Sequence, residues 1–384
     1  MKPLINRKDF PATQNSTYLN AASVALMHQG AANAVIEWQI DLRDYGTLHF
    51  DELAEEKIYD DLRLMAARLF HVQPEDIAVG SSATELLASL AWAVDVNPGS
   101  NIVSTEVVFP STIYPWTRVV KDSRSEIRLA KGKDGYIQPD DVIALIDDQT
   151  KVVCLSHVEF GSGQRYDLKK FADAAHAVNA LLIADATQSA GMLPIDVQDS
   201  GVDVLVCAAY KWLCGPFGVA VMYIAPELQS ELYPGLLGWR SHADMWDLRA
   251  NRLRLPDTAK RFEFSTLAYG SVIGLTQSIQ YLLQVGIENI FAYTTDLASM
   301  LIKGLSERGI EIMSPQADDE RTAIVAARFP GKGSAEVAGY LNANNVVVSQ
   351  RGEYVRFSPH LYNEPDDISK TLELIDSMEI NFEA

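Results

Sequence analysis

The 384-residue sequence has no long apolar run, little cysteine and a shortage of positive charge. No apolar run reaches the roughly 18 residues that a membrane-spanning helix needs, so we expect no membrane partner. Thirty-two basic against fifty-one acidic residues give a net charge of −19, which argues against nucleic acid or an anionic membrane as a partner. The opening MKPLINRKDFPATQ lacks the apolar core of a secretory signal. These absences predict a cytoplasmic protein.

Only three cysteines are present, Cys154, Cys207 and Cys214. All three lie in apolar segments, and none forms a cluster with histidine at the spacing of metal ligands, so we expect no metal site. The motif G-x-G-x-x-G is absent after the first predicted strand. This absence weighs against a Rossmann-like nucleotide binder.

Apolar runs and helical periods alternate through the middle of the chain. Short apolar runs predict strands, and the segments between them repeat apolar residues at helical spacing. The alternation is typical of βαβ units, which form a mostly parallel sheet with helices on both faces. The predicted strands are 75–80, 101–105, 125–130, 151–158, 181–186, 202–210 and 218–224, with helices at 81–94 and 167–180 among them.

The pattern changes at about Arg252. Two helical periods, at 271–286 and 290–309, are followed by shorter segments of mixed helix and strand character. We predict a large α/β domain over residues 18–251 and a smaller α+β domain over residues 252–384. The N-terminal segment 1–17 is a candidate to pack on the smaller domain.

One lysine, Lys211, stands in the almost wholly apolar stretch VCAAYKWLCGPFGVAVMYI. A buried ammonium group is costly unless it is paired or chemically used. A desolvated lysine has a lowered pKa and can act as a nucleophile that forms an imine. The structural alternative is a lysine that extends its charged end from a strand terminus to solvent.

Two further polar motifs follow predicted strands. GSSATE opens a helix, where Ser82 and Glu85 have capping-box spacing; the helix start can bind an anion or be an ordinary cap. Asp185 ends the strand LLIAD and is followed by Gln188; a helix cap, a metal ligand and a charge partner for a ligand remain open for it. A phosphate site, an aspartate and a buried lysine together suggest pyridoxal phosphate.

Six motifs in order resemble the aminotransferase class V group of fold-type I pyridoxal-phosphate enzymes. This group includes cysteine desulfurases, kynureninase, isopenicillin N epimerase-like enzymes and carbon–sulfur lyases. The resemblance runs from about Tyr18 to Ile368 and implies the fold-type I architecture, pyridoxal 5′-phosphate as cofactor, and a homodimer with shared active sites. The motifs are YLNAAS, GSSATE, ADATQSAG, AAYKWLCGPFG, RFEFSTLAYG and VRFSPHLYNEPDDI.

The resemblance also implies a role for each matching residue. Lys211 would hold the cofactor as a Schiff base, and Asp185 would pair with its pyridinium nitrogen. Arg356 would bind the substrate carboxylate, with a surface ion pair as the structural alternative. The other implied contacts are Ala83, Thr84 and Tyr210 on the phosphate, Phe109 stacked on the ring or else part of the core, Gln188 on the phenolic oxygen, Thr266 on the partner subunit's phosphate, and Asn20 and Ala21 in the substrate pocket.

Three departures from the desulfurases bear on the reaction. Ala208 and Tyr210 stand where those enzymes commonly have serine and histidine, and Phe160 stands where they use asparagine on the phenolic oxygen. No cysteine follows Cys214, whereas the desulfurases carry a persulfide-forming cysteine shortly before the carboxylate-binding arginine. A persulfide relay is therefore disfavoured.

These residues predict an enzyme that acts on an amino-acid substrate through an external aldimine, with Lys211 as the base at Cα. Transamination is the first interpretation, and β-elimination from a cysteine derivative or epimerisation are the alternatives. A non-enzymatic alternative is an inert binding protein on the same scaffold. Trp239, Arg240 and His242, in GLLGWRSHADMW, are expected to help select the substrate side chain.

Overall fold

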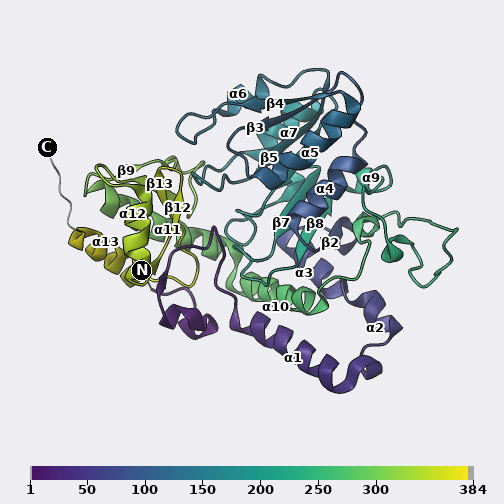
Figure 1. The fold of residues 1–384 in the computed structure, drawn as a ribbon, viewed down its shortest axis with the longest axis horizontal. Coiled ribbons are helices and arrows are strands. Elements are labelled where there is room, and N and C mark those ends of the chain that lie inside the picture. Colours follow the sequence, from purple (N-terminus) through teal and green to yellow (C-terminus); the bar gives the residue numbers. More distant parts are fainter. Residues whose placement is uncertain (1, 379–384) are drawn as a thin grey trace.

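The computed structural model describes residues 2–378, which form a large and a small α/β unit connected by long helices (Figure 1). The large unit contains a seven-stranded sheet of order β2-β8-β7-β6-β5-β3-β4. Its strands are β2 (Ile77–Gly80), β3 (Asn101–Thr105), β4 (Glu126–Ala130), β5 (Thr150–Ser156), β6 (Leu181–Asp185), β7 (Val204–Ala208) and β8 (Ala220–Ile224).

The predicted mostly parallel α/β sheet is confirmed, with one exception. Strands β4, β3, β5, β6 and β7 pair in parallel, whereas β8 lies antiparallel to both of its neighbours, β7 and β2. The connection after β7, residues 209–219, contains no helix that could serve as a crossover, and β8 returns antiparallel beside β7. That connection carries Lys211.

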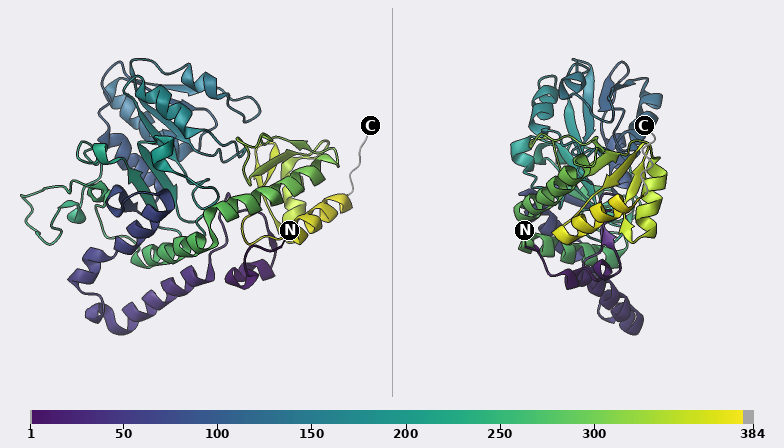
Figure 2. Two further views of the ribbon diagram at one scale, coloured as in Figure 1. Left: turned by 180° about the vertical axis from the view of Figure 1, so that it is seen from behind. Right: turned by 90° about the vertical axis from the view of Figure 1, so that its left-hand side faces the viewer.

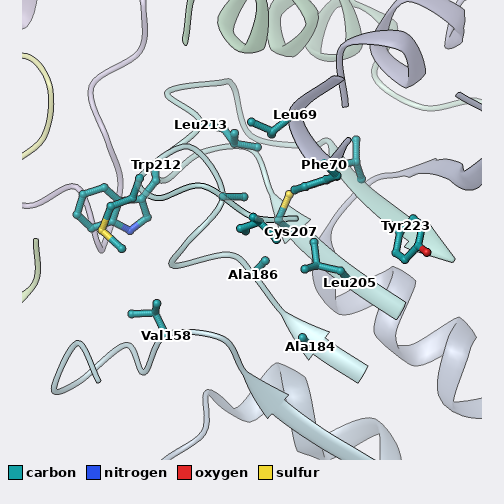
Figure 3. Close-up of a cluster of buried hydrophobic side chains, with 14 of the residues drawn as sticks. Leu69, Phe70, Val158, Ala184, Ala186, Leu205, Cys207, Trp212, Leu213 and Tyr223 are labelled. Atoms are coloured by element: carbon teal, nitrogen blue, oxygen red, sulfur yellow. The ribbon is translucent and has the colours of Figure 1, made fainter. Parts of the chain in front are cut away.

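Both faces of the large sheet are buried, and alternate residues of each strand point to opposite faces. In β5, Val153 and Leu155 join the core under α3 (Asp60–Phe70), α7 (Leu168–His176) and α10 (Tyr269–Val285). Figure 3 shows this core around Cys207, with Phe70 beside it. Cys154 faces the other core, under α4 (Ala83–Ala93) and α5 (Pro110–Ser123).

The small unit contains an antiparallel sheet of order β12-β13-β10-β9. The helices α11, α12 and α13 share its apolar core. The bounds are β9 (Glu311–Ile312), β10 (Val325–Arg328), β12 (Ser349–Arg351), β13 (Tyr354–Phe357), α11 (Ile287–Ser306), α12 (Ser334–Ala343) and α13 (Pro365–Ser377).

The N-terminal segment runs along the small unit before it joins the large one. Strand β1 (Thr17–Tyr18) pairs in parallel with β11 (Val346–Val347), and Arg7 pairs with Asp367 of α13. The chain then enters α1 (Gln29–Tyr45), which lies beside α10 (Figure 2). The remaining short helices are α2 (Glu52–Lys57), α6 (Pro139–Ile143), α8 (Val197–Ser200) and α9 (Pro226–Gln229).

Helix α10 lies after the predicted boundary at 251/252, yet it packs on α1 and α3 of the large unit. Helix α11 packs on α13 and β10 of the small unit. The two helices after residue 252 thus pack on different units, and the domain boundary at 251/252 stays a prediction. Within residues 2–378, no helix combines the length and apolar character needed to cross a membrane, and no three histidine, cysteine or carboxylate side chains gather as metal ligands would.

Candidate active site

A pocket opens at the carboxyl ends of β5, β6 and β7, where ligands of parallel sheets bind. It contains about 480 Å³ of empty space, a value that includes open solvent at its mouth. Seven of the predicted site residues line it: Ala83, Thr84, Phe109, Asp185, Gln188, Tyr210 and Lys211.

Lys211 lies three residues beyond the end of β7 and is 7% exposed. Its Nζ is 5.2 Å from the centroid of the Phe109 ring, and no carboxylate of the described residues is within ion-pair distance of it. Burial lowers the pKa of Lys211 to about 8, although the negative charge of Asp185 acts in the opposite direction. A larger fraction of this amine is therefore neutral, and thus nucleophilic, near pH 7 than for an exposed lysine.

Asp185 is the last residue of β6, and hydrogen bonds hold both of its carboxylate oxygens. Its Oδ1 accepts from the Thr187 amide at 2.9 Å, and its Oδ2 accepts from the Thr112 hydroxyl at 3.0 Å. Each oxygen has a second lone pair that can accept from a ligand. Thr112 comes from the first turn of α5, and no pattern in the sequence pointed to it.

The first turn of α4 forms a third part of the pocket wall. The Ser82 hydroxyl caps this turn by accepting from the Glu85 amide at 3.1 Å. Glu85 Oε1 accepts from the Ser81 amide, one residue before the position a capping box would use. The amides of Ala83 and Thr84 are thus available to an anion, since the first turn has no acceptors of its own. Ser111, which sequence reasoning missed, accepts from the Thr84 hydroxyl and also lines the pocket.

Gln188 presents hydrogen-bond donors to the pocket. Its Oε1 accepts from the indole of Trp212 at 2.8 Å, and its Nε2 donates to the Ala22 carbonyl at 2.9 Å. The amide is therefore fixed with oxygen turned to the indole, and one N–H of Nε2 remains for a ligand. This polarity suits a phenolate oxygen, the contact predicted for Gln188.

Aromatic rings form the mouth of the pocket. Phe109 is 38% exposed and meets Phe160 edge to face, with ring centroids 5.3 Å apart. Tyr210 stacks on Phe217 at 4.5 Å. A half-exposed ring at a pocket mouth does not have the environment of a core side chain, which favours the stacking interpretation for Phe109.

Arg356 does not line the pocket but contacts the backbone of Phe160, which does. Its guanidinium donates to the Phe160 carbonyl and to the Ser23 hydroxyl, both at 2.6 Å. The residue has no exposed surface, and no carboxylate within residues 2–378 pairs with it, so the alternative of a surface ion pair is wrong. Burial, aided by the positive charge of Arg351, lowers the pKa of Arg356 to about 9.

The other predicted site residues are spread over two places. Asn20 and Ala21 lie beside β13, where the Ala21 amide donates to the Ser358 carbonyl. Thr266 is exposed and accepts from the Trp239 indole at 3.1 Å, away from this pocket. Its contact with a partner subunit stays a prediction.

The segment with Trp239, Arg240 and His242 does not reach the pocket of its own chain. Arg240 is buried and donates to the Glu55 carbonyl at 3.1 Å, with its guanidinium 4.5 Å from the Tyr59 ring centroid. These contacts give Arg240 a structural role, because its guanidinium is already used. Selection of the substrate side chain by this segment is not supported within one chain.

Glu159 is a buried carboxyl group near the site that sequence reasoning also missed. Its Oε1 accepts from the Tyr166 hydroxyl at 3.1 Å, and its Oε2 has no partner. Burial, together with the negative charge of Asp185, raises its pKa to about 8. Glu159 therefore keeps its proton to higher pH than an exposed glutamate does.

The pocket fits pyridoxal phosphate. An amine with a lowered pKa, a carboxylate with free lone pairs, two free amides in the first turn of a helix and a ring at the mouth are the groups that this cofactor needs. All of them face one space. Lys211 and Asp185 would hold the aldehyde and pyridine ends, and α4 would hold the phosphate.

Comparison with known proteins gives one consistent result. The family described as Aminotransferase class-V matches residues 18–370. The uncharacterized aminotransferase YcbU of Bacillus subtilis is 26% identical over 96% of each chain. A probable cysteine desulfurase of Pyrococcus abyssi is 25% identical over 97% of this chain and 96% of its own.

Two solved structures share the fold. The apo cysteine desulfurase of Thermococcus onnurineus superposes with a TM-score of 0.87 at 24% identity, covering 96% of each chain. The cystine C–S lyase C-DES, in complex with its product cysteine persulfide, has a TM-score of 0.87 at 22% identity, covering 96% of this chain and 99% of its own.

Proposed function

Because the chain belongs to the class-V aminotransferase family and is therefore a pyridoxal-phosphate enzyme, we propose that it is an aminotransferase for an α-amino acid. One observation carries the choice of reaction. Among the side chains that line the pocket, only Lys211, Asp185 and Tyr210 can titrate, and no cysteine or histidine is present. Transamination can use a single amine, whereas epimerisation needs a second base on the opposite side of Cα. Tyr210 is a poor candidate for that base, because burial and the charge of Asp185 raise the pKa of its hydroxyl.

The pocket residues divide the work as follows. Bound pyridoxal phosphate supplies an aldehyde for the substrate amine and a ring that accepts the electron pair released at Cα. The Nζ of Lys211 would remove the Cα proton and deliver it to the carbon on the other side of the substrate nitrogen. Asp185 stabilises positive charge at the pyridine nitrogen, and the N–H of Gln188 donates to the phenolic oxygen.

Arg356 has the binding role in this proposal. Its planar guanidinium suits the α-carboxylate, and its hydrogen bond to the Phe160 carbonyl holds it next to a residue that lines the pocket. The unpartnered Nε is buried, and an incoming carboxylate can accept from it after a small movement. A fixed carboxylate orients the Cα–H bond towards Lys211.

β-Elimination from a cysteine derivative is the second candidate, because several relatives are named cysteine desulfurases. No cysteine lines the pocket, and all three are buried and free. Burial raises the pKa of Cys154 to about 12 and raises the pKa values of Cys207 and Cys214 further. Sulfur would then leave as a small product and not as a protein persulfide.

We also propose a homodimer with shared sites in the reducing cytoplasm. Large apolar side chains are exposed on α1, on α5 and beside Tyr210, among them Ile36, Ile40, Tyr114 and Phe217. A second copy would cover such a surface and bring its own Thr266 to this pocket. Three free cysteines suit a reducing compartment.

One experiment tests the function. The purified holoenzyme should be yellow and bleach with borohydride, and a panel of amino acids should be assayed for keto acid and released sulfide. Keto acid from a sulfur-free amino acid, with the amino group passed to a second keto acid, supports the aminotransferase. Pyruvate, ammonia and cysteine persulfide from cystine, or pyruvate, ammonia and sulfide from cysteine, indicate the lyase. A colourless protein that forms no keto acid contradicts both.

A further inference from the structure

Two arginines share one serine at the boundary between the small unit and the N-terminal segment. The Ser23 hydroxyl oxygen accepts from Arg356 at 2.6 Å and from Arg351 at 2.9 Å. Two guanidinium groups are therefore held side by side although they repel each other. Such a pair is stable only if something else requires it or compensates it.

A one-way chain of hydrogen bonds fixes the pair. The Ser349 hydroxyl donates to Asn20 Oδ1 at 2.7 Å, so it accepts from the Ser23 hydroxyl at 2.8 Å. Both serine protons are thus used within the chain of bonds. Ser23 can only accept from the arginines, and it holds one N–H group of each in place.

No acid compensates the pair. Neither Arg351 nor Arg356 forms an ion pair in the part of the chain that the structure describes, although the sequence carries fifty-one acidic residues. Buried Arg356 also has an Nε without any acceptor. A buried cation without a partner is costly. An anion that arrives from outside would supply the missing partner.

The positive charge exceeds what a single α-carboxylate neutralises. Asp185 is the only carboxylate that lines the pocket, and the pyridine nitrogen of the cofactor requires it. A substrate with one carboxylate would compensate one guanidinium and leave the other. A substrate with a second anion would compensate both.

We propose that Arg351 forms a second anion subsite, so that the preferred substrate is an amino acid whose side chain carries a negative charge. This inference rests on the proposed function for the reacting end of the substrate. Arg356 takes the α-carboxylate because it contacts Phe160, which lines the pocket, whereas Arg351 contacts Ser23 and its own neighbour Gln350. Arg351 is half-buried and is held next to Arg356 by the Ser23 hydroxyl that both contact, so a substrate side chain that extends beyond the α-carboxylate would meet it.

Kinetics with matched substrates test the subsite. L-Aspartate and L-glutamate are compared with L-asparagine and L-glutamine, which have almost the same shape without the second charge. We expect wild type to prefer each acid over its amide in kcat/KM by about 10- to 100-fold, the worth of a charge-assisted hydrogen bond. Arg351→Met should remove this preference, and Arg351→Lys should restore part of it.

Direct binding gives a second readout that does not depend on turnover. Calorimetry on the holoenzyme with succinate and glutarate, against butyrate, measures the preference for two carboxylates. We expect the dicarboxylates to bind about tenfold or more tightly than butyrate, and Arg351→Met to abolish the difference. Ser23→Ala keeps both guanidinium groups but removes the hydroxyl that holds them in place. It should therefore reduce the affinity difference between dicarboxylates and butyrate only in part.

A matched control is Arg328→Met, since Arg328 lies on β10 of the same sheet but is paired with Glu311. It should leave the acid-to-amide ratio unchanged. If Arg351→Met lowers kcat/KM equally for acids and amides, the proposal is overturned. Arg351 would then bind the α-carboxylate. A wild-type enzyme without preference for dicarboxylates would also overturn it. Absence of keto acid from every amino acid, with dicarboxylate binding intact, would contradict only the proposed function.

Discussion

The positive charges of the site lie in two regions, Lys211 on the large unit (the lysine wall) and Arg351 with Arg356 on the small unit (the arginine wall). The two regions differ in whether a carboxylate lies near the positive charge. On the large unit, Lys211 lies near Asp185, which lines the same pocket and raises the lysine pKa against burial. On the small unit, Arg351 and Arg356 have only neutral acceptors. Both walls are largely buried, so the difference is not one of exposure.

The carboxylate beside Lys211 and its absence beside the arginines agree with how long the cofactor and the substrate stay bound. A resident cofactor needs a fixed acid, and Asp185 is held by Thr112 and Thr187 in the orientation that it requires. A substrate arrives with its own negative charge and leaves again. An internal acid on the arginine wall would compete with it at every turnover.

Removing the lysine should have the largest effect. Lys211→Ala deletes both the covalent anchor of the cofactor and the base, so turnover should fall by at least about 10³-fold. The yellow absorbance of the lysine-bound cofactor should be lost, although α4 can still retain some cofactor. Lys169→Ala, at an exposed ion pair on α7, is the control. Normal turnover in Lys211→Ala would mean that the wrong amine has been assigned.

Neutralising the acid of the lysine wall comes next. Asp185→Asn keeps the shape but removes the charge, so kcat should fall by about 10²- to 10³-fold. Thr112→Val removes only the hydroxyl bonded to Oδ2, and we expect a loss of about tenfold. If the two variants lose activity equally, the charge of Asp185 is not what matters.

Arg356→Met should weaken substrate binding and leave the spectrum of the bound cofactor as it is. Loss of a charge-assisted contact predicts a decrease of about 10- to 100-fold in kcat/KM, mostly through KM. Arg356→Lys keeps the charge and should recover part of the loss. An unchanged KM with an altered spectrum would place the arginine's role at the cofactor.

The lowered pKa of Lys211 predicts a pH dependence of cofactor attachment. Only the neutral amine attacks the aldehyde, so the rate at which the apoenzyme binds pyridoxal phosphate should rise with pH and level off above about 8. Asp185→Asn removes a charge that raises this pKa, so its midpoint should lie at lower pH. Stopped-flow absorbance measures both. A midpoint near that of a free lysine, about 10.4, would contradict burial of the amine.

The smallest effect is expected from the cysteines. Replacing Cys154, Cys207 and Cys214 by alanine should lower the thermal midpoint by several degrees, since all three side chains are buried in the core. Activity per folded molecule should stay within about threefold, because buried thiols are inert. A persulfide detected by mass spectrometry, with alanine as product and both lost in a single-cysteine variant, would restore the desulfurase interpretation.

Much of the lysine wall could be predicted from the sequence because each of its residues follows a strand or opens a helix. Asp185 ends β6, Lys211 follows β7, and Ala83 and Thr84 begin α4. Parallel strands bring their carboxyl ends to one edge whatever the details of packing. The local pattern therefore determined both the fold class and the shared location of these residues.

Tertiary structure alone decided the arginine wall. Ser23 and Arg356 are 333 positions apart, and their contact exists only because the N-terminal segment runs beside β13. The same packing turned Arg240 towards Glu55 and away from the site, and it supplied Thr112 to Asp185. The alternation of apolar residues along a strand predicts on which face of its own sheet a side chain lies. It carries no information on which distant segment that side chain meets, because this depends on how the two units and the N-terminal segment bury their apolar faces together.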